Sequence, residues 1–248
     1  MQKIIGAMRR AIKDFSLIHD GDKIAVGVSG GKDSLALLTA LSLYKRYSPE
    51  KFDLVGVSID VGFPEGEEGL QKIKEYSEGL GTPFHIERTD IAKIVFDERK
   101  EQSPCSLCSK MRRGALNTVA TSLGANVVAL GHHADDVLDT FLLSFIYEGR
   151  LSTFKPYTYL DRTGIAVIRP FVYVQEGDIK GASRRLNFPI YKNPCPEDKH
   201  TEREYMKNLV DNITKDIPIA RDRMISAITH SERYSLFPSR HSVQNDDN

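Results

Sequence analysis

The chain has 248 residues, of which 40% are hydrophobic and 27% charged, and its net charge is zero. This composition is that of an ordinary globular protein and excludes fibrous and largely disordered proteins. No apolar run is long enough to span a membrane, and residues 1–19 lack the apolar core of a secretory signal, so we expect a cytoplasmic protein without membrane contact.

Apolar runs alternate with helical patterns along most of the chain. An N-terminal helix is expected within residues 1–20, and a domain of alternating strands and helices within 21–195. The predicted strands are 23–28, 52–60, 83–90, 126–133 and 165–174, and the predicted helices between them are 34–47, 68–81, 104–124, 134–149 and 176–187. This alternation predicts an α/β fold, with a parallel twisted sheet, helices on both faces and ligands at the carboxyl ends of the strands.

The remaining sequence predicts a short helical extension. Residues 201–215 and 218–230 have helical patterns and form C-terminal helices within 196–230. Residues 231–248 are polar and are expected to be a flexible tail.

A glycine-rich turn follows the first predicted strand and precedes a helix. Backbone N–H groups in such a turn suit the binding of phosphate. A Walker A loop would need glycine at Val26 and Ser or Thr at Asp33, and the dinucleotide pattern G-x-G-x-x-G is also absent. The motif that does match is S-G-G-x-D-S, formed by Ser29, Gly30, Gly31, Lys32, Asp33 and Ser34.

This motif resembles the loop of the PP-loop ATPases, also called N-type ATP pyrophosphatases. Members of that superfamily split ATP between the α- and β-phosphates and pass AMP to an acceptor. The resemblance implies that residues 29–34 bind the pyrophosphate of ATP, with Lys32 neutralising charge. It also implies that Ser58, Asp60 and Gly131, at the ends of two predicted strands, lie near the nucleotide.

Three cysteines suggest metal or thiol chemistry. Cys105 and Cys108 have the C-x-x-C spacing that lets two thiols reach one metal, and Cys195 lies between two prolines. An odd number of cysteines argues against a disulfide framework. The residues leave two alternatives open: a zinc site completed by His200 or His132, or an iron–sulfur cluster with one open iron that can bind sulfide.

Three further segments narrow the resemblance. "PCSLCSKMRRGAL", "ALGHHADDVLDTFLLSFIYEGRL" and "IRPFVYVQEGDI" follow the loop in this order. They resemble the tRNA 2-thiocytidine synthetase family, which thiolates cytidine 32 of the anticodon loop, over roughly residues 20–200. The resemblance implies that Cys105, Cys108 and Cys195 hold a 4Fe–4S cluster. Ala134, where many members have Arg, and the segment after Cys195 depart from the family pattern.

A polar group follows the fourth predicted strand and comprises His132, His133, Asp135 and Asp136. Acidic residues at a helix start often only cap the helix. Alternatively, an aspartate here holds magnesium with phosphate oxygens or acts as an acid or base, and the resemblance favours Asp135 for that role. Arg112 and Arg113, one turn after Cys108, are expected to contact RNA.

The resemblance implies an ATP-dependent tRNA sulfurtransferase in which ATP adenylates a pyrimidine C2 oxygen and sulfur then displaces AMP. The expected catalytic residues are Lys32, Asp135 and Cys195, and the expected cofactors are ATP, Mg²⁺ and a 4Fe–4S cluster. The expected partners are tRNA, a sulfur donor and a second copy of the chain in a homodimer. The sulfur donor is either free sulfide or sulfide derived from a cysteine desulfurase. Two alternatives remain: thiolation of a tRNA uridine or small molecule, and a nucleotide-binding iron or zinc sensor.

Overall fold

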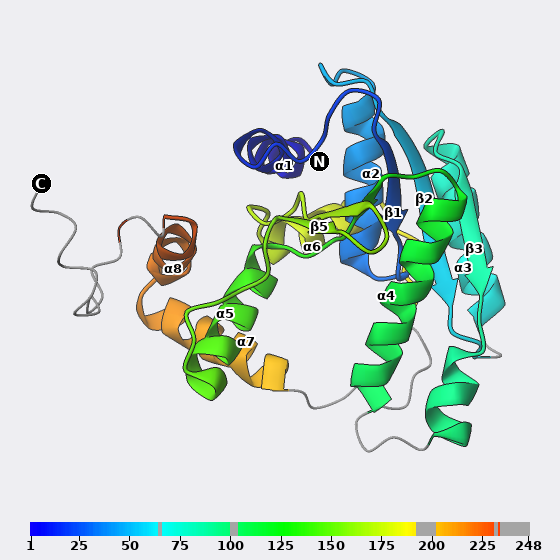
Figure 1. The fold of residues 1–248 in the computed structure, drawn as a ribbon. Helices are drawn as coiled ribbons and strands as arrows, with labels where there is room; N and C mark the ends of the chain where they lie inside the picture. Colours follow the sequence, from blue (N-terminus) through cyan, green and yellow to red (C-terminus); the bar gives the residue numbers. More distant parts are fainter. Residues whose placement is uncertain (64–65, 100–103, 192–201, 231–232, 234–248) are drawn as a thin grey trace, which may run out of the picture.

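The computed structural model describes residues 1–63, 66–99, 104–191, 202–230 and 233, and its centre is a six-stranded sheet with the order β3-β2-β1-β4-β6-β5 (Figure 1). The strands are β1 (Lys23–Gly27), β2 (Asp53–Asp60), β3 (Phe84–Arg88), β4 (Val127–Ala129), β5 (Tyr157–Leu160) and β6 (Ile165–Ile168). The helices are α1 (Gln2–Asp14), α2 (Lys32–Lys45), α3 (Glu67–Gly79), the π-helix η2 (Lys93–Glu98), α4 (Pro104–Ser122), α5 (Ala134–Glu148), α6 (Glu176–Arg185), α7 (Glu202–Asp216) and α8 (Ala220–Thr229).

The sheet is parallel from β3 to β6, and only the edge strand β5 is antiparallel. The predicted parallel sheet with helices on both faces is therefore confirmed. The predicted strand 165–174 is too long, because β6 ends at Ile168 and Pro170, which has no N–H to donate, follows two residues later. The sequence analysis also missed β5, whose alternating exposed side chains gave no buried apolar run.

Side-chain alternation sends each strand's residues to two different cores. Ile24 and Val26 of β1 pack into the larger core with α1, α2 and α6, whereas Ala25 packs into the smaller core with α4. The buried face of α4 consists of Leu116, Val119 and Ala120. A single helix therefore covers part of one face of the sheet and leaves space beside it.

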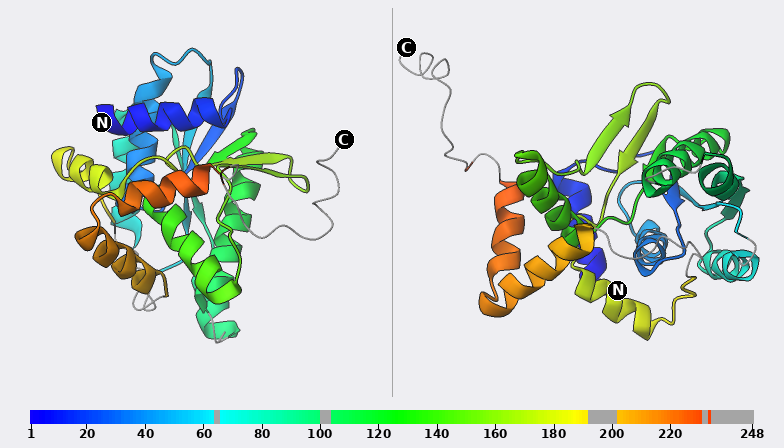
Figure 2. Two further views of the ribbon diagram at one scale, coloured as in Figure 1. Left: turned by 90° about the vertical axis from the view of Figure 1, so that its left-hand side faces the viewer. Right: turned by 90° about the horizontal axis from the view of Figure 1, so that it is seen from below.

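The C-terminal helices pack against α5, and Met206 and Val210 of α7 are buried (Figure 2). In the same figure, the β5–β6 hairpin projects from the sheet. Within the described ranges no helix has the length and apolar character needed to cross a bilayer.

Candidate active site

The glycine-rich loop closes through Ser34. The Ser34 hydroxyl accepts a hydrogen bond from the Ser29 N–H (3.1 Å) and donates one to the Gly31 carbonyl (2.9 Å). Gly30 adopts a left-handed conformation with φ +86°, which glycine tolerates without strain. Helix α2 begins at Lys32, two residues earlier than predicted, so the motif supplies the helix's first turn. The N–H groups of a first turn have no partner within the helix and suit an anion.

The ends of β2 and β4 meet this loop. Ser58 is buried and lines a small cavity with Ser29 and Asp60. A Cβ atom on Gly131 would lie 3.0 Å from the backbone carbonyl of Asp33, so glycine permits this close approach. The structure thus brings together the loop and the three residues expected near the nucleotide.

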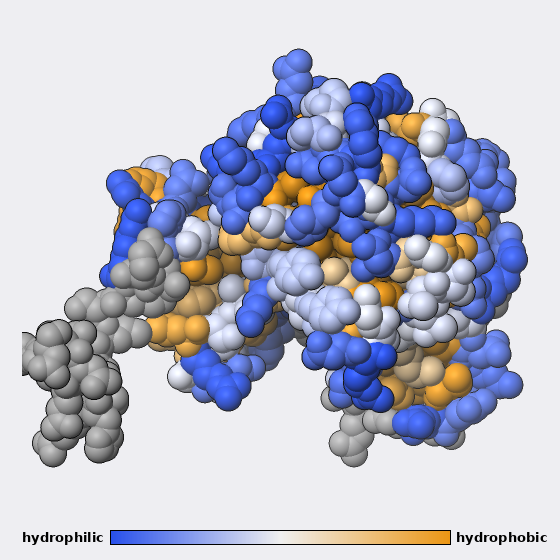
Figure 3. All heavy atoms as spheres, turned by 45° about the horizontal axis from the view of Figure 1, so that its top comes forward, coloured by the Kyte–Doolittle hydropathy of each residue, from blue (hydrophilic) through white to orange (hydrophobic). Residues whose placement is uncertain are grey.

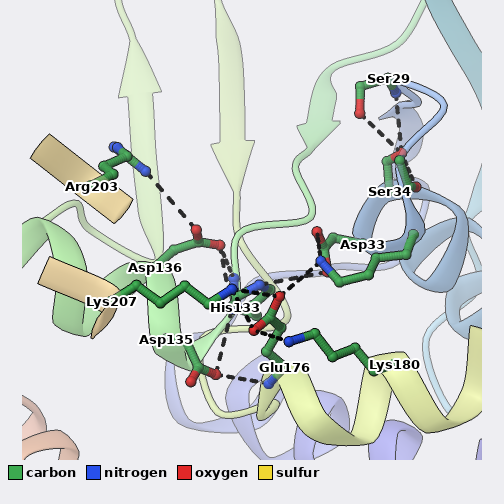
Figure 4. A network of polar contacts seen from close by, with 12 residues as sticks. Ser29, Asp33, Ser34, His133, Asp135, Asp136, Glu176, Lys180, Arg203 and Lys207 are labelled. Carbon is green, nitrogen blue, oxygen red and sulfur yellow. Dashed lines mark hydrogen bonds and ion pairs between the residues drawn. The ribbon is translucent and has the colours of Figure 1, made fainter. Parts of the chain in front are cut away.

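Lys32 is held by two carboxylates. Its Nζ atom lies 3.0 Å from Asp33 Oδ2 and 3.0 Å from Glu176 Oε1. Glu176 also pairs with Lys180 and Lys207, both at 2.9 Å (Figure 4). A carboxylate at the start of α6 therefore joins α2, α6 and α7 around the loop lysine.

These contacts favour the charged forms of both groups. Burial alone would lower the pKa of Lys32, but the charges of Asp33 and Glu176 outweigh it and raise the pKa above its ordinary value. Burial would raise the pKa of Glu176, yet hydrogen bonds from Lys180, Lys207 and Lys32 hold it far below its ordinary value. Lys32 is accordingly a cation at neutral pH.

The acidic residues at the start of α5 have protein partners. Asp136 Oδ2 accepts the His133 N–H (2.9 Å) in a capping box. Asp135 is buried, its Oδ2 atom accepts the Glu176 N–H (2.8 Å), and its Oδ1 atom pairs with Arg221 of α8. Capping thus accounts for Asp136, and Asp135 links α5 to α6 and α8.

Asp33 has one carboxylate oxygen with fewer close contacts than the oxygens of Asp135. Its Oδ1 atom is buried and has no hydrogen-bond partner in the described part of the chain, although His133 Nε2 lies 3.5 Å away. Because Asp33 lies in the first turn of α2, this oxygen lies beside the expected phosphate site.

Two of the three cysteines lie on the first turn of α4. Cys105 is exposed and Cys108 is half-buried. Cys195 and His200 lie outside the described residues, and within the described ones no group of three His, Cys, Asp or Glu side chains is arranged around a metal position. The Tyr191 N–H donates to the Gly30 carbonyl (3.0 Å), so the chain meets the loop four residues before Cys195.

The Tyr191 ring also packs closely against α3. A Cβ atom on Gly69 would overlap the ring, and one on Gly30 would lie 3.3 Å from ring atom Cδ1. Glycine at both positions therefore lets one aromatic ring fill the space between the loop and α3.

A cavity of about 550 Å³ extends from the loop beneath β4 and β6. Its wall includes Ser29, the predicted Arg112 and Arg113 of α4, His132 after β4, and two further arginines, Arg169 after β6 and Arg203 of α7. In Figure 3 a hollow separates the α5 and α7 side of the molecule from the α4 side. The cavity thus joins the phosphate loop to a basic surface.

The sequence analysis missed Arg169, Glu176, Arg203 and Lys207. Glu176 follows the predicted strand 165–174 at the ligand-binding edge of the sheet, which was a usable signal for this edge. Arg169 lay inside that predicted strand, which in the structure ends at Ile168. Arg203 and Lys207 gave none, because only the packing of α7 on α5 brings them to the site.

Comparisons with known proteins agree with this geometry. The model of the PP-loop domain family matches residues 3–213. The tRNA-cytidine(32) 2-sulfurtransferase of Syntrophotalea carbinolica is 40% identical over 232 residues, covering 92% of this chain and 88% of that protein. The protein of the same name from Geobacter sulfurreducens is 39% identical over 239 residues, covering 95% and 92%.

A solved structure shares the fold. The U34-tRNA thiolase NcsA from Methanococcus maripaludis, determined with its 4Fe–4S cluster, superposes with a TM-score of 0.74 at 23% identity, covering 95% of this chain and 80% of that one. The fold, the S-G-G-x-D-S loop and these relatives agree. The chain belongs to the PP-loop family and, within it, to the family of the tRNA-cytidine(32) 2-sulfurtransferases.

Proposed function

We propose that this protein is an ATP-dependent tRNA sulfurtransferase that replaces the C2 oxygen of a cytidine, at position 32, with sulfur. The observation that carries the proposal is the continuity of the phosphate loop at Ser29 with an arginine-lined cavity of about 550 Å³. A nucleotide and an RNA base must share one cavity for AMP to pass between them, and family membership supplies the substrate.

The loop binds and activates ATP. The C2 oxygen of the base attacks the α-phosphate, the bond to the β-phosphate breaks, and pyrophosphate leaves with its charge facing the N–H groups of the first turn of α2. Lys32 neutralises that charge. Sulfide then adds at C2 and AMP departs with the oxygen, so the overall change is a substitution without net oxidation.

Magnesium fits Asp33 better than Asp135. The ion prefers carboxylate and phosphate oxygens in an octahedral shell. Asp33 Oδ1 lies beside the loop without a hydrogen-bond partner in the described ranges, whereas both oxygens of Asp135 are engaged by Glu176 and Arg221. Asp33 would then hold the ion against the phosphates, while Asp135 keeps the helices in place.

The two thiols of α4 precede residues of the same helix that line the cavity. Cys105 and Cys108 lie on one helical turn, and Arg112 on the next turn lines the cavity. Cys195 follows Tyr191, which is bonded to the loop. A 4Fe–4S cluster held by these three thiolates would supply sulfur, received as sulfide that is either free or released by a thiol reductant from the persulfide of a cysteine desulfurase. With tRNA as its substrate, the protein acts in the cytoplasm.

Anaerobic reconstitution tests this function. The purified protein is incubated with Mg-ATP, sulfide and unmodified tRNA, and the nucleosides are analysed by mass spectrometry. We expect 2-thiocytidine together with AMP and pyrophosphate. Cys105→Ala, Cys108→Ala and Cys195→Ala should each abolish thiolation and leave nucleotide binding unchanged.

Ser106→Ala is the matched control, because Ser106 is exposed on the same turn of α4. It should thiolate like the parent protein. Formation of 2-thiouridine in place of 2-thiocytidine would refute the base assignment. Full activity in all three cysteine variants would refute the role of the thiols, and AMP release that does not depend on tRNA would refute turnover on RNA.

A further inference from the structure

Most of the unpartnered buried polar atoms in the described residues belong to side chains that line this cavity. Across the described residues, six buried side-chain atoms lack a hydrogen-bond partner. Four of them belong to residues that line this cavity: Asn117 Oδ1, His132 Nδ1, Thr140 Oγ1 and Arg169 Nε. Buried polar atoms without a partner are destabilising, so their concentration in the lining of one cavity indicates a site built for a polar ligand.

These residues come from four different elements. Asn117 lies on α4, His132 follows β4, Thr140 lies on α5 and Arg169 follows β6. Because neighbouring strands are about 4.8 Å apart, the end of β6 lies about 10 Å from the end of β1, where the phosphate loop begins. The Arg169 end of the cavity therefore lies apart from the phosphate loop.

The walls suit a flat ring. Val128, Leu130 and Val167 provide apolar surface, and Phe154 lies 5.1 Å from the His132 ring and 5.2 Å beneath the Arg169 guanidinium. Burial lowers the pKa of His132 to about 4, so its imidazole is neutral at physiological pH and can both donate and accept. The pocket combines stacking surface with hydrogen-bonding groups, as single-stranded RNA recognition requires.

We propose that this part of the cavity is the pocket for the target cytosine, with Asn117 and Arg169 as the residues that distinguish it from uracil. The inference rests on the proposed function and adds the residues that determine specificity. Arginine only donates hydrogen bonds, so Arg169 suits the acceptor N3 of cytosine and opposes the N3–H of uracil. The Asn117 carbonyl suits the N4 amino group of cytosine, where uracil has a second acceptor.

The pocket is tested by changing one side chain of the protein and one group of the target base. The substrates are two anticodon stem-loops, one with cytosine and one with pyrimidin-2-one, which lacks only the 4-amino group, at position 32. For the cytosine substrate, Asn117→Leu should lower kcat/KM for thiolation by about 5- to 150-fold, the range expected for loss of one such hydrogen-bonded pair. With pyrimidin-2-one, parent and variant should be equal, because the lost partner is already missing.

Further variants separate recognition from folding. Asn117→Asp keeps the acceptor and should retain activity on cytosine. Thr140→Val removes one hydroxyl from the pocket and should lower kcat/KM even if Asn117→Leu does not fold, whereas Thr118→Val removes an exposed hydroxyl on α4 and should change nothing. The affinity for ATP should be unchanged throughout.

The outcomes also separate the two proposals. If the parent protein thiolates RNA and both Asn117→Leu and Thr140→Val have the same kcat/KM as the parent, the proposed pocket is wrong and the proposed function stands. Equal losses by Asn117→Leu on both substrates, or a weakened affinity for ATP, would overturn it as well. A parent protein that thiolates no RNA would overturn both the function and the pocket.

Discussion

Lys32 shows how one side chain can be positioned before its substrate arrives. In the structure its ammonium group lies between Asp33 and Glu176, at 3.0 Å from each. Glu176 is in turn held by Lys180 and Lys207, so it remains charged and fixed even when Lys32 turns towards phosphate. The conformational entropy that the Lys32 side chain would lose on binding phosphate has thus largely been lost on folding already.

We predict that Lys32→Ala slows tRNA-dependent pyrophosphate release by about 100-fold or more, because a preorganised cation at the leaving group is lost. The measurement is a pyrophosphate assay with tRNA and saturating ATP. Lys180→Ala is the control, since Lys180 pairs with the same Glu176 but lies outside the loop, and it should stay within about threefold of the parent. An unchanged rate for Lys32→Ala would contradict the role of the loop.

Some residues of this site can be predicted from the sequence and others cannot. Residues 29–34 could be recognised because the phosphate site is a local turn, built entirely from consecutive residues. The position of Glu176 after a predicted strand indicated the ligand-binding edge of the sheet but not its pairing with Lys32, because more than half of the chain separates the two residues and only the sheet order brings β6 near β1. Local geometry is readable from sequence, whereas long-range pairing depends on the packed fold.

At the scale of elements, the start of α5 is a junction. The side chain of Asp135 accepts the first N–H of α6 and pairs with Arg221 of α8, while Asp136 caps its own helix. The sequence predicted that acidic residues here would cap a helix, hold a metal, or act as an acid or base. It could not indicate a third possibility, a link between helices that are distant in the chain.

We predict that Asp135→Ala lowers the free energy of unfolding by about 3 kcal/mol, because it leaves the partly buried Arg221 with one fewer carboxylate partner and the Glu176 N–H without its acceptor. Urea denaturation in EDTA measures this. Asp136→Ala, which removes a cap, should cost about 1 kcal/mol. Parent-like stability of Asp135→Ala in EDTA, with a loss only of magnesium-dependent activity, would instead assign Asp135 to the metal.

At the scale of the whole molecule, the net charge is zero, but positive charge is concentrated around one cavity. Arg112 and Arg113 on α4, Arg169 after β6 and Arg203 on α7 all line one cavity. The sequence predicted the α4 pair from its position after the cysteines, but Arg203 reaches the cavity only because α7 packs on α5. The alternation of strands and helices predicted the sheet, while the edge hairpin and the docking of the last helices depended on tertiary contacts.

We predict that Arg113→Ala weakens tRNA binding and reduces the slope of log Kd against log salt by about 0.7–0.9, the value for one phosphate contact. Binding is measured by fluorescence anisotropy over a series of salt concentrations. Arg184→Ala is the control, because Arg184 is exposed on α6, on the opposite side of the sheet from α4. Identical slopes for Arg113→Ala and the parent would remove Arg113 from the RNA-binding surface.

Tyr191 joins the two chemistries of the protein within a short length of chain. Its N–H is bonded to the carbonyl of Gly30, its ring fills the space left by Gly69, and Cys195 follows four residues later. Any movement of Gly30 when pyrophosphate enters or leaves would pull on that bond. Such a movement would be transmitted to the chain at Tyr191, which precedes the proposed cluster ligand Cys195 by four residues.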